Sequence, residues 1–262
     1  MSLAQIGRRA TKAAALPAGV IKRSRPGDVV ILLYHRIGAG GSEIELSSEA
    51  FERHLEHLST REHVVSLDDA LDDERGGVVV TFDDGYADFY THALPLLERY
   101  RIPAVLYLAT SLVDPRGEDP ERLTWGQLEE AVSTGLVTIG SHTHNHVNLA
   151  TISSNAEATE EMISSKAIIE DRLQIECNHF AYPWAVSSPA AEHVARQIFT
   201  TAALLAWKTN RRGRIDPYRL GRVPILASDG DVFFRAKVRG GLDGEAVFYK
   251  ALKRGPWREP NG

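Results

Sequence analysis

The sequence predicts a single-domain α/β protein folded as an irregular (β/α) barrel of about seven parallel strands. Short apolar runs alternate with stretches of helical periodicity along the 262 residues, which is typical of a parallel sheet with helices outside it. Two of the runs end in carboxylates or imidazoles, at residues 78–86 (VVVTFDDGY) and 137–146 (VTIGSHTHNH). The length suits one barrel, because α/β barrels of ~250 residues commonly form a single domain. A doubly wound open sheet is the alternative.

Strands are expected where β-branched and other apolar residues form short runs between turn residues. The first run, residues 28–35 (DVVILLYH), ends at His35. Helical periodicity fills most of the gaps between the runs. The expected strands are 28–35, 64–67, 78–82, 104–108, 137–140, 180–182, 200–206 and 219–225.

Helices are expected where apolar residues recur every three or four positions. Pro95 should make the first turns of the helix at 88–101 irregular. The helix at 153–173 is expected to turn four apolar side chains inward, namely Met162, Ile163, Ala167 and Ile168. Other helices are expected to open at Ser47 and to cover 124–134, 188–197 and 231–253, the last broken at Gly240 and Gly241.

The composition excludes several kinds of protein. The net charge is −5 at pH 7, and an acidic chain offers no general basic face for nucleic acid. Cys177 is the only cysteine, so no intrachain disulfide framework exists. No apolar run approaches the ~20 residues of a transmembrane helix. The 43% hydrophobic content is enough for one large core.

Residues 1–25 carry six basic side chains and no acidic one. A cleaved signal peptide is disfavoured, because the apolar stretch 13–21 is short and is interrupted by Pro17 and Gly19. We expect a basic lead-in at 1–27, the domain at 28–255 and a polar tail at 256–262. The lead-in is expected to be solvated, with weak contact to an anionic membrane surface as the alternative. The expected location is the cytoplasm or the periphery of the inner membrane.

Two adjacent carboxylates, Asp83 and Asp84, follow the valines at 78–80, and Gly85 comes directly after them. In α/β folds the carboxyl ends of strands are where ligands bind. Neighbouring side chains at a strand end point in different directions, so one aspartate can hold a metal while the other handles a proton. A plain turn is the alternative, because Asp-Asp-Gly is also good turn chemistry.

Three of the ten histidines, His142, His144 and His146, lie within five residues after another expected strand. Imidazole is the commonest neutral metal ligand, and two imidazoles with one carboxylate suit zinc with an open coordination position. A chance polar loop is the alternative. The two segments together predict a metal site at one end of the barrel.

These segments resemble the NodB-like polysaccharide deacetylases, the fourth carbohydrate esterase family. Residues 81–85 (TFDDG) match the first motif of the family, residues 142–146 (HTHNH) match the second, and residues 180–184 (FAYPW) resemble the third. Residues 34–35 (YH) resemble the subgroup that acts on exopolysaccharides of the poly-N-acetylglucosamine type. The resemblance covers about residues 29–225 and implies a distorted (β/α) barrel.

The resemblance also implies roles for the motif residues. One divalent metal would be held by Asp84, His142 and His146, with zinc expected and cobalt or nickel as alternatives. Asp83 would be the base that takes a proton from the attacking water. His144 falls at a variable position of its motif, which implies a place at the rim or beside the ligands.

The implied substrate is an N-acetylated amino sugar in a polysaccharide or its precursor. The Trp184 backbone N–H maps to the family's donor for the oxyanion of the tetrahedral intermediate. Tyr86, Tyr182 and Trp184 offer flat faces for sugar rings, with core packing as the alternative for each.

Two departures from the family pattern affect the site. Ala181 stands where the third motif usually has an arginine that holds the catalytic aspartate. Arg222, on the last strand, is assigned to substrate binding and is a candidate to replace that arginine, with a structural ion pair as the alternative. The family's C-terminal Leu-x-His, which supplies the general acid, is missing because no histidine follows His193. His35 is the candidate acid, with a hydrogen-bonded core histidine as the alternative.

The sequence therefore predicts a metal-dependent hydrolase that removes N-acetyl groups from an amino-sugar polysaccharide or its precursor. An O-acetyl esterase acting on a glycan and a non-catalytic carbohydrate-binding relative are the alternatives. The intact aspartates and histidines of the first two motifs favour an enzyme, whereas the missing acid favours the binding protein.

Overall fold

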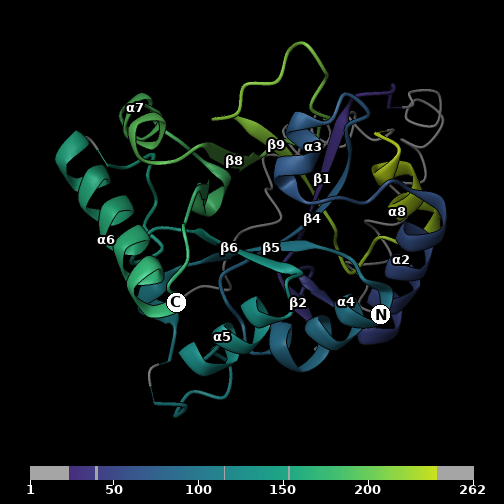
Figure 1. Ribbon diagram of the computed structural model, residues 1–262, viewed down its shortest axis with the longest axis horizontal. Helices are drawn as coiled ribbons and strands as arrows, with labels where there is room; N and C mark the ends of the chain where they lie inside the picture. Colours follow the sequence, from purple (N-terminus) through teal and green to yellow (C-terminus); the bar gives the residue numbers. More distant parts are fainter. Residues whose placement is uncertain (1–23, 39–40, 115, 153, 241–262) are drawn as a thin grey trace.

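The computed structural model describes residues 24–38, 41–114, 116–152 and 154–240. Seven parallel strands close into a barrel in the order β1-β4-β5-β6-β7-β8-β9, which confirms the predicted barrel and excludes the open sheet (Figure 1). Two short strands, β2 (Arg36–Ile37) and β3 (Glu45–Leu46), pair with each other beside it. The barrel strands are β1 (Val29–Tyr34), β4 (Gly77–Asp83), β5 (Ala104–Leu108), β6 (Val137–Ser141), β7 (His179–Ala181), β8 (Thr201–Leu205) and β9 (Leu220–Pro224).

Along the barrel strands, alternate side chains point into the barrel and out toward the helices. In β4, Val79 belongs to the interior cluster, whereas Val78 and Val80 belong to the outer core. The same alternation turns Thr81 and Asp83 inward. The interior cluster consists of Val29, Ile31, Leu67, Ala70, Val79, Val105, Tyr107, Ala181, Ala203 and Leu220. An apolar interior thus ends in a polar layer where β4 finishes.

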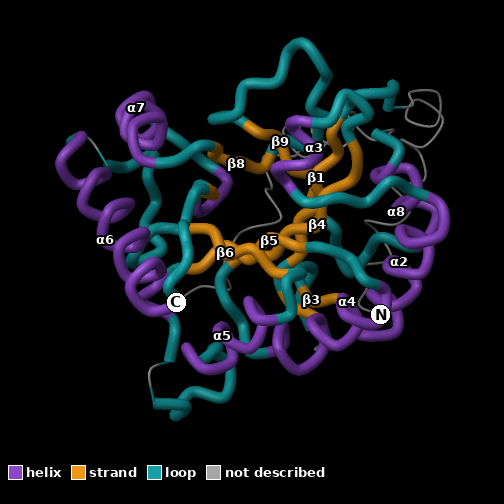
Figure 2. Tube along the Cα trace, in the orientation of Figure 1, coloured by secondary structure: helices purple, strands orange, loops and turns teal. Residues whose placement is uncertain are grey.

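Helices surround the barrel and cover the outward faces of its strands (Figure 2). One of them, α3, sends Leu67 and Ala70 into the interior cluster, and so closes the end of the barrel where β4 begins. The helical segments are α2 (Ser48–Arg61), α3 (Leu67–Asp72), η1 (Phe89–Ala93), α4 (Leu94–Tyr100), η2 (Thr110–Leu112), α5 (Trp125–Ser133), α6 (Asn155–Leu173), η3 (Pro183–Ala185), α7 (Pro189–Ile198) and α8 (Asp231–Val238).

The predicted strand at 64–67 is wrong. Only Val64 makes a β-bridge, a parallel one to Val78. Leu67 instead begins α3, because the Ser66 hydroxyl accepts a hydrogen bond from the Asp69 backbone N–H at 3.1 Å and caps the helix. The short apolar run at 64–67 therefore contains a helix cap, and its apolar residues do not extend into a strand.

The predicted inward face of α6 is also wrong in part. Met162 is buried as expected, but Ile163 is 50% exposed, and the small polar Ser165 is buried. The packing of the helix against β6 and α7 sets this face. The apolar residues of α6 do not form one continuous stripe, so their spacing alone did not define it.

Three further expectations concern helix ends and segments. A π-helical turn, η1, precedes α4 and the first turn of α4 contains Pro95, which confirms the predicted irregularity. The predicted helix at 231–253 is described only as far as residue 240, where α8 ends at Val238. Residues 1–23 of the predicted lead-in at 1–27 and the whole tail at 256–262 lie outside the described residues, so the domain boundaries stay predictions. Within the described ranges, no helix is long and apolar enough to cross a membrane.

His54 of α2 is a buried titratable side chain in the outer core, 1% exposed. Its ring stacks on Phe234 of α8 with centroids 3.6 Å apart, and its Nδ1 lies 3.3 Å from the Tyr34 hydroxyl. Burial lowers the pKa of His54 to about 4, although the charges of Asp229 and Asp231 act in the opposite direction. An unfolded histidine titrates near ~6.5, so below that pH the unfolded chain binds a proton that the folded chain excludes.

We therefore expect the neutral His54 ring to make its full contribution to the free energy of unfolding above about pH 6.5. Between that pH and pH 4 the free energy of unfolding should fall by about 2–3 kcal/mol on account of this residue. His54→Phe, which keeps a ring against Phe234, should show a shallower loss of melting temperature between pH 7.5 and 4.5 than the wild type. Thermal melts of both proteins across this range measure the difference. Parallel pH profiles would contradict the assignment.

Candidate metal centre and active site

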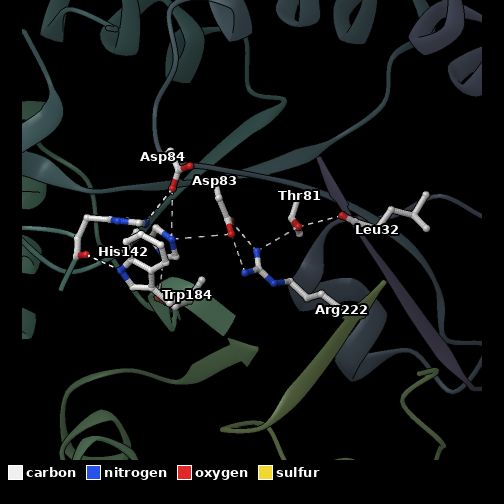
Figure 3. Close-up of polar contacts among 9 residues, drawn as sticks. Leu32, Thr81, Asp83, Asp84, His142, Trp184 and Arg222 are labelled. Atoms are coloured by element: carbon white, nitrogen blue, oxygen red, sulfur yellow. Dashed lines mark hydrogen bonds and ion pairs between the residues drawn. The ribbon is translucent and has the colours of Figure 1, made fainter. Parts of the chain in front are cut away.

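The polar residues of the two motifs meet at the carboxyl end of the barrel (Figure 3). Asp83 is the last residue of β4 and Asp84 follows it, while His142 follows β6, two strands away. The His142 backbone N–H donates to the Leu108 carbonyl of β5 at 2.7 Å and so extends the strand pairing. The pairing of β4 and β6 with β5 therefore brings carboxylates from β4 and imidazoles from the β6 loop together.

Asp84, His142 and His146 offer three ligand atoms that lie within 4.8 Å of one another. Asp84 Oδ1 lies 3.5 Å from His142 Nε2 and 3.2 Å from His146 Nε2. Zinc bonds of about 2.0–2.2 Å in a tetrahedron separate neighbouring ligand atoms by about 3.3–3.6 Å. The donor types and their spacing fit a divalent metal.

The hydrogen bond made by His142 prepares its other nitrogen for a metal. His142 Nδ1 lies 2.8 Å from the Ala181 carbonyl oxygen, which can only accept, so Nδ1 carries the hydrogen. Burial lowers the pKa of His142 to about 4, against the opposing charge of Asp83, so the ring is neutral at pH 7. Nε2 thus turns a lone pair toward the Asp84 carboxylate, and a cation between these two acceptors relieves their repulsion.

Four residues of the site have left-handed backbone conformations that are uncommon for residues other than glycine. Their φ angles are 75° at Asp84, 64° at Thr143, 55° at His146 and 58° at Trp184. Such conformations cost of the order of 1–3 kcal/mol each and persist where the surroundings impose them. Two of the four are proposed metal ligands, so the strain coincides with the site.

Arg222 of β9 holds Asp83 across the barrel. Its Nη1 donates to Asp83 Oδ1 at 2.6 Å and its Nη2 to Oδ2 at 2.7 Å, with the side chains 1% and 4% exposed (Figure 3). Burial raises the pKa of Asp83, but the charges of Arg222 and His142 outweigh it and lower the pKa overall. The burial of Arg222 leaves it little surface for a substrate, and its contact is the one expected of an arginine that holds the catalytic aspartate.

His35 follows β1 directly and is 9% exposed. Burial lowers the pKa of His35, and the charges of Asp84 and Asp83 oppose this in part. Tyr34 of β1 pairs with Phe82 of β4, so His35 follows its strand beside the end of β4 that leads into both carboxylates. The strand end therefore brings His35 to the same region as the two motifs, as predicted. Its role as the acid stays a prediction.

Trp184 lies beside the proposed metal ligands and is 37% exposed. Its indole Nε1 donates to the His146 carbonyl oxygen at 3.1 Å, and the two ring centroids are 5.3 Å apart. Among the three aromatic candidates for substrate contact, Trp184 has the most accessible ring.

Tyr86 and Tyr182 are placed differently. Two guanidinium carbons, those of Arg36 and Arg122, lie 4.7 and 4.8 Å from the centroid of the half-buried Tyr86 ring. Tyr182 is fully buried, and its ring packs edge-on against Phe180. Tyr182 therefore has the core-packing role that was its alternative, and the described structure leaves its ring no exposed face.

No pattern in the sequence predicts a contact between His144 and Thr110. His144 Nδ1 lies 2.8 Å from Thr110 Oγ1, and His144 is not one of the three donor residues. Its expected place at the rim or beside the ligands stays a prediction. Thr110 belongs to no motif. The signal that could have found it is its position, because it follows β5, the strand between β4 and β6.

Known proteins similar to this chain were found by sequence and by structure. A family profile described as polysaccharide deacetylase matches residues 71–203. The chain is 28% identical over 171 residues to YxkH of Bacillus subtilis (strain 168), which covers 62% of this chain and 59% of that protein. It is 34% identical over 99 residues to the poly-beta-1,6-N-acetyl-D-glucosamine N-deacetylase of Escherichia coli (strain K12). This match covers 31% of this chain and 15% of that protein. The structure of IcaB from Ammonifex degensii matches with a TM-score of 0.71 at 25% identity. This match covers 83% of this chain and 97% of that one.

The chain spans less than two thirds of the length of these two curated relatives. The profile match nevertheless runs over just over half of the 262 residues. It includes Asp83, Asp84, His142 and His146, the residues that converge at the barrel end. The chain belongs to the polysaccharide deacetylase family.

Proposed function

We propose that this chain is a metal-dependent deacetylase that removes N-acetyl groups from an amino-sugar polysaccharide or its precursor. The observation that carries the proposal is the buried Asp83 carboxylate, whose Oδ2 lies 3.8 Å from His142 Nε2 and thus beside the three donor residues. The likeness to the poly-beta-1,6-N-acetyl-D-glucosamine N-deacetylase of Escherichia coli supports a polymer of N-acetylglucosamine as the substrate class.

A divalent metal held by Asp84, His142 and His146 would supply Lewis-acid polarisation of the acetyl carbonyl. We propose zinc, because one carboxylate and two imidazoles with an open position are typical of catalytic zinc. Cobalt and nickel accept the same nitrogen and oxygen ligands.

The reaction is amide hydrolysis by residues of this chain. Asp83 takes a proton from the water that attacks the carbonyl carbon, while Arg222 orients both carboxylate oxygens. The Trp184 backbone N–H is the donor assigned to the developing oxyanion. The carbon–nitrogen bond then breaks, and the leaving amine takes a proton from His35, which yields acetate and a free amino sugar. Burial lowers the pKa of His35, and the charges of Asp84 and Asp83 are what favour its protonated form for this step.

Acetate release from defined sugars tests this function. We expect release from N-acetylglucosamine oligomers, loss of release after treatment with a chelator, and recovery when zinc is returned. Release from acetyl esters but from no amide would favour the O-acetyl esterase instead. Binding of the oligomers without any release, by protein that contains metal, would favour the non-catalytic relative.

We expect His35→Ala to lower amide turnover far more than turnover of an activated acetyl ester. An amine is a poor leaving group unless it is protonated, whereas an activated ester departs without an acid. Parallel assays of one purified variant on both substrates measure the ratio, and a melting curve monitors folding. Equal losses on both substrates with a lowered melting temperature would indicate that His35 only supports the core.

A further inference from the structure

The loop that carries two of the proposed ligands has a backbone that needs external support. Thr143 and His146 both have positive φ angles, 64° and 55°. Residues other than glycine keep this conformation only where their surroundings impose it. The position of His146 therefore depends on contacts outside its own loop.

Glu161 of α6 makes four such contacts. Its backbone carbonyl accepts a hydrogen bond from the His144 N–H at 3.1 Å, and its carboxylate makes the other three. Its Oε2 accepts hydrogen bonds from the backbone N–H groups of His144 at 3.1 Å and of Asn145 at 2.8 Å. Its Oε1 accepts from Asn145 Nδ2 at 2.7 Å. Both carboxylate oxygens are thus used on the two residues that precede His146, and charge-assisted bonds of this kind are stronger than neutral ones.

A second contact of α6 fixes the other end of the same segment. Ser165 lies one helical turn after Glu161, and its hydroxyl is 2.9 Å from the hydroxyl of Ser141, with both residues fully buried. Met162 and Ile169 anchor this face of α6 in the outer core. The helix therefore holds the segment from Ser141 to Asn145 on both sides of His142.

The geometry points to Glu161 as a positioning residue that sets the metal affinity of the site by orienting the loop before His146. The inference rests on the proposed metal site. Glu161 touches no ligand atom. It acts through the backbone of His144 and Asn145, in the way that groups beside metal ligands commonly control metal affinity.

The test measures zinc affinity directly, by competition with a chromophoric chelator. We expect Glu161→Ala to weaken zinc binding by about 10–100-fold, as loss of a partner beside metal ligands typically does. The matched control is Glu160→Ala, which removes the same charge from the preceding position of the same helix. Glu160 is exposed, and its carboxylate accepts only from the Ser164 hydroxyl among the described residues. The control should bind zinc like the wild type.

A second variant guards against a folding defect. Glu161→Met keeps the length of the side chain and a high helix propensity but offers no oxygen, so it should show the same loss of affinity. Wild-type affinity in the folded Met variant, or a lowered melting temperature of the metal-free protein with unchanged affinity, would overturn the inference. A wild-type chain that bound no zinc would refute the proposed metal site and this inference together, whereas normal binding by every variant would refute the inference alone.

Discussion

Replacing Asp83 with asparagine should lower amide turnover by ~10²–10⁴-fold, the usual contribution of a positioned base. The side-chain amide of the asparagine cannot take the proton of the attacking water. The three proposed ligands do not include Asp83, so the variant should keep its metal. Acetate release and elemental analysis of the same preparation measure both properties.

The same substitution should also lower stability, because it leaves the buried Arg222 without its counter-charge. Removing one partner of a buried ion pair commonly costs about 3–5 kcal/mol. The double variant Asp83→Asn with Arg222→Met removes both charges and should recover part of that stability. It should remain inactive, since no base is restored, and this separates the catalytic loss from the folding loss.

Two results would contradict the role of Asp83. One is turnover close to that of the wild type in the folded single variant. The other is recovery of turnover together with stability in the double variant, which would assign the whole effect to folding.

Replacing His146 with alanine should remove metal and activity together. The variant loses one of three donors, and the remaining pair, Asp84 and His142, offers one carboxylate and one imidazole. Because even the loss of a residue beside a metal ligand weakens binding by about 10–100-fold, loss of a ligand should have a larger effect. Elemental analysis of purified protein measures the metal, and acetate release measures the activity.

His144→Ala is the matched control for this variant. His144 lies in the same loop but outside the group of three donors, and its Nδ1 contacts Thr110 instead. We expect His144→Ala to keep most of its metal. Full occupancy in His146→Ala, or equal loss in both variants, would refute the assignment of His146 as a ligand.

The local patterns of the sequence predicted the barrel and most of its strands. Alternation of apolar runs with helical periodicity is a local property, and so is the placement of polar residues at the ends of β4 and β6. The expectation for 64–67 failed because a short apolar run does not reveal a helix cap at Ser66. The prediction of the buried face of α6 was wrong in part because the spacing of its apolar residues fits more than one face of the helix.

By itself, the sequence determined which side chains form the proposed site: Asp83 and Asp84 at one strand end, and His142 and His146 after another. Only the tertiary structure decided what holds them. Arg222 reaches Asp83 from 139 positions away, because β9 pairs with β1 and β1 with β4 to close the barrel. The Ala181 carbonyl fixes the tautomer of His142, and a backbone oxygen carries no side-chain signature in the sequence. These contacts depend on strand order and register, which no local pattern specifies.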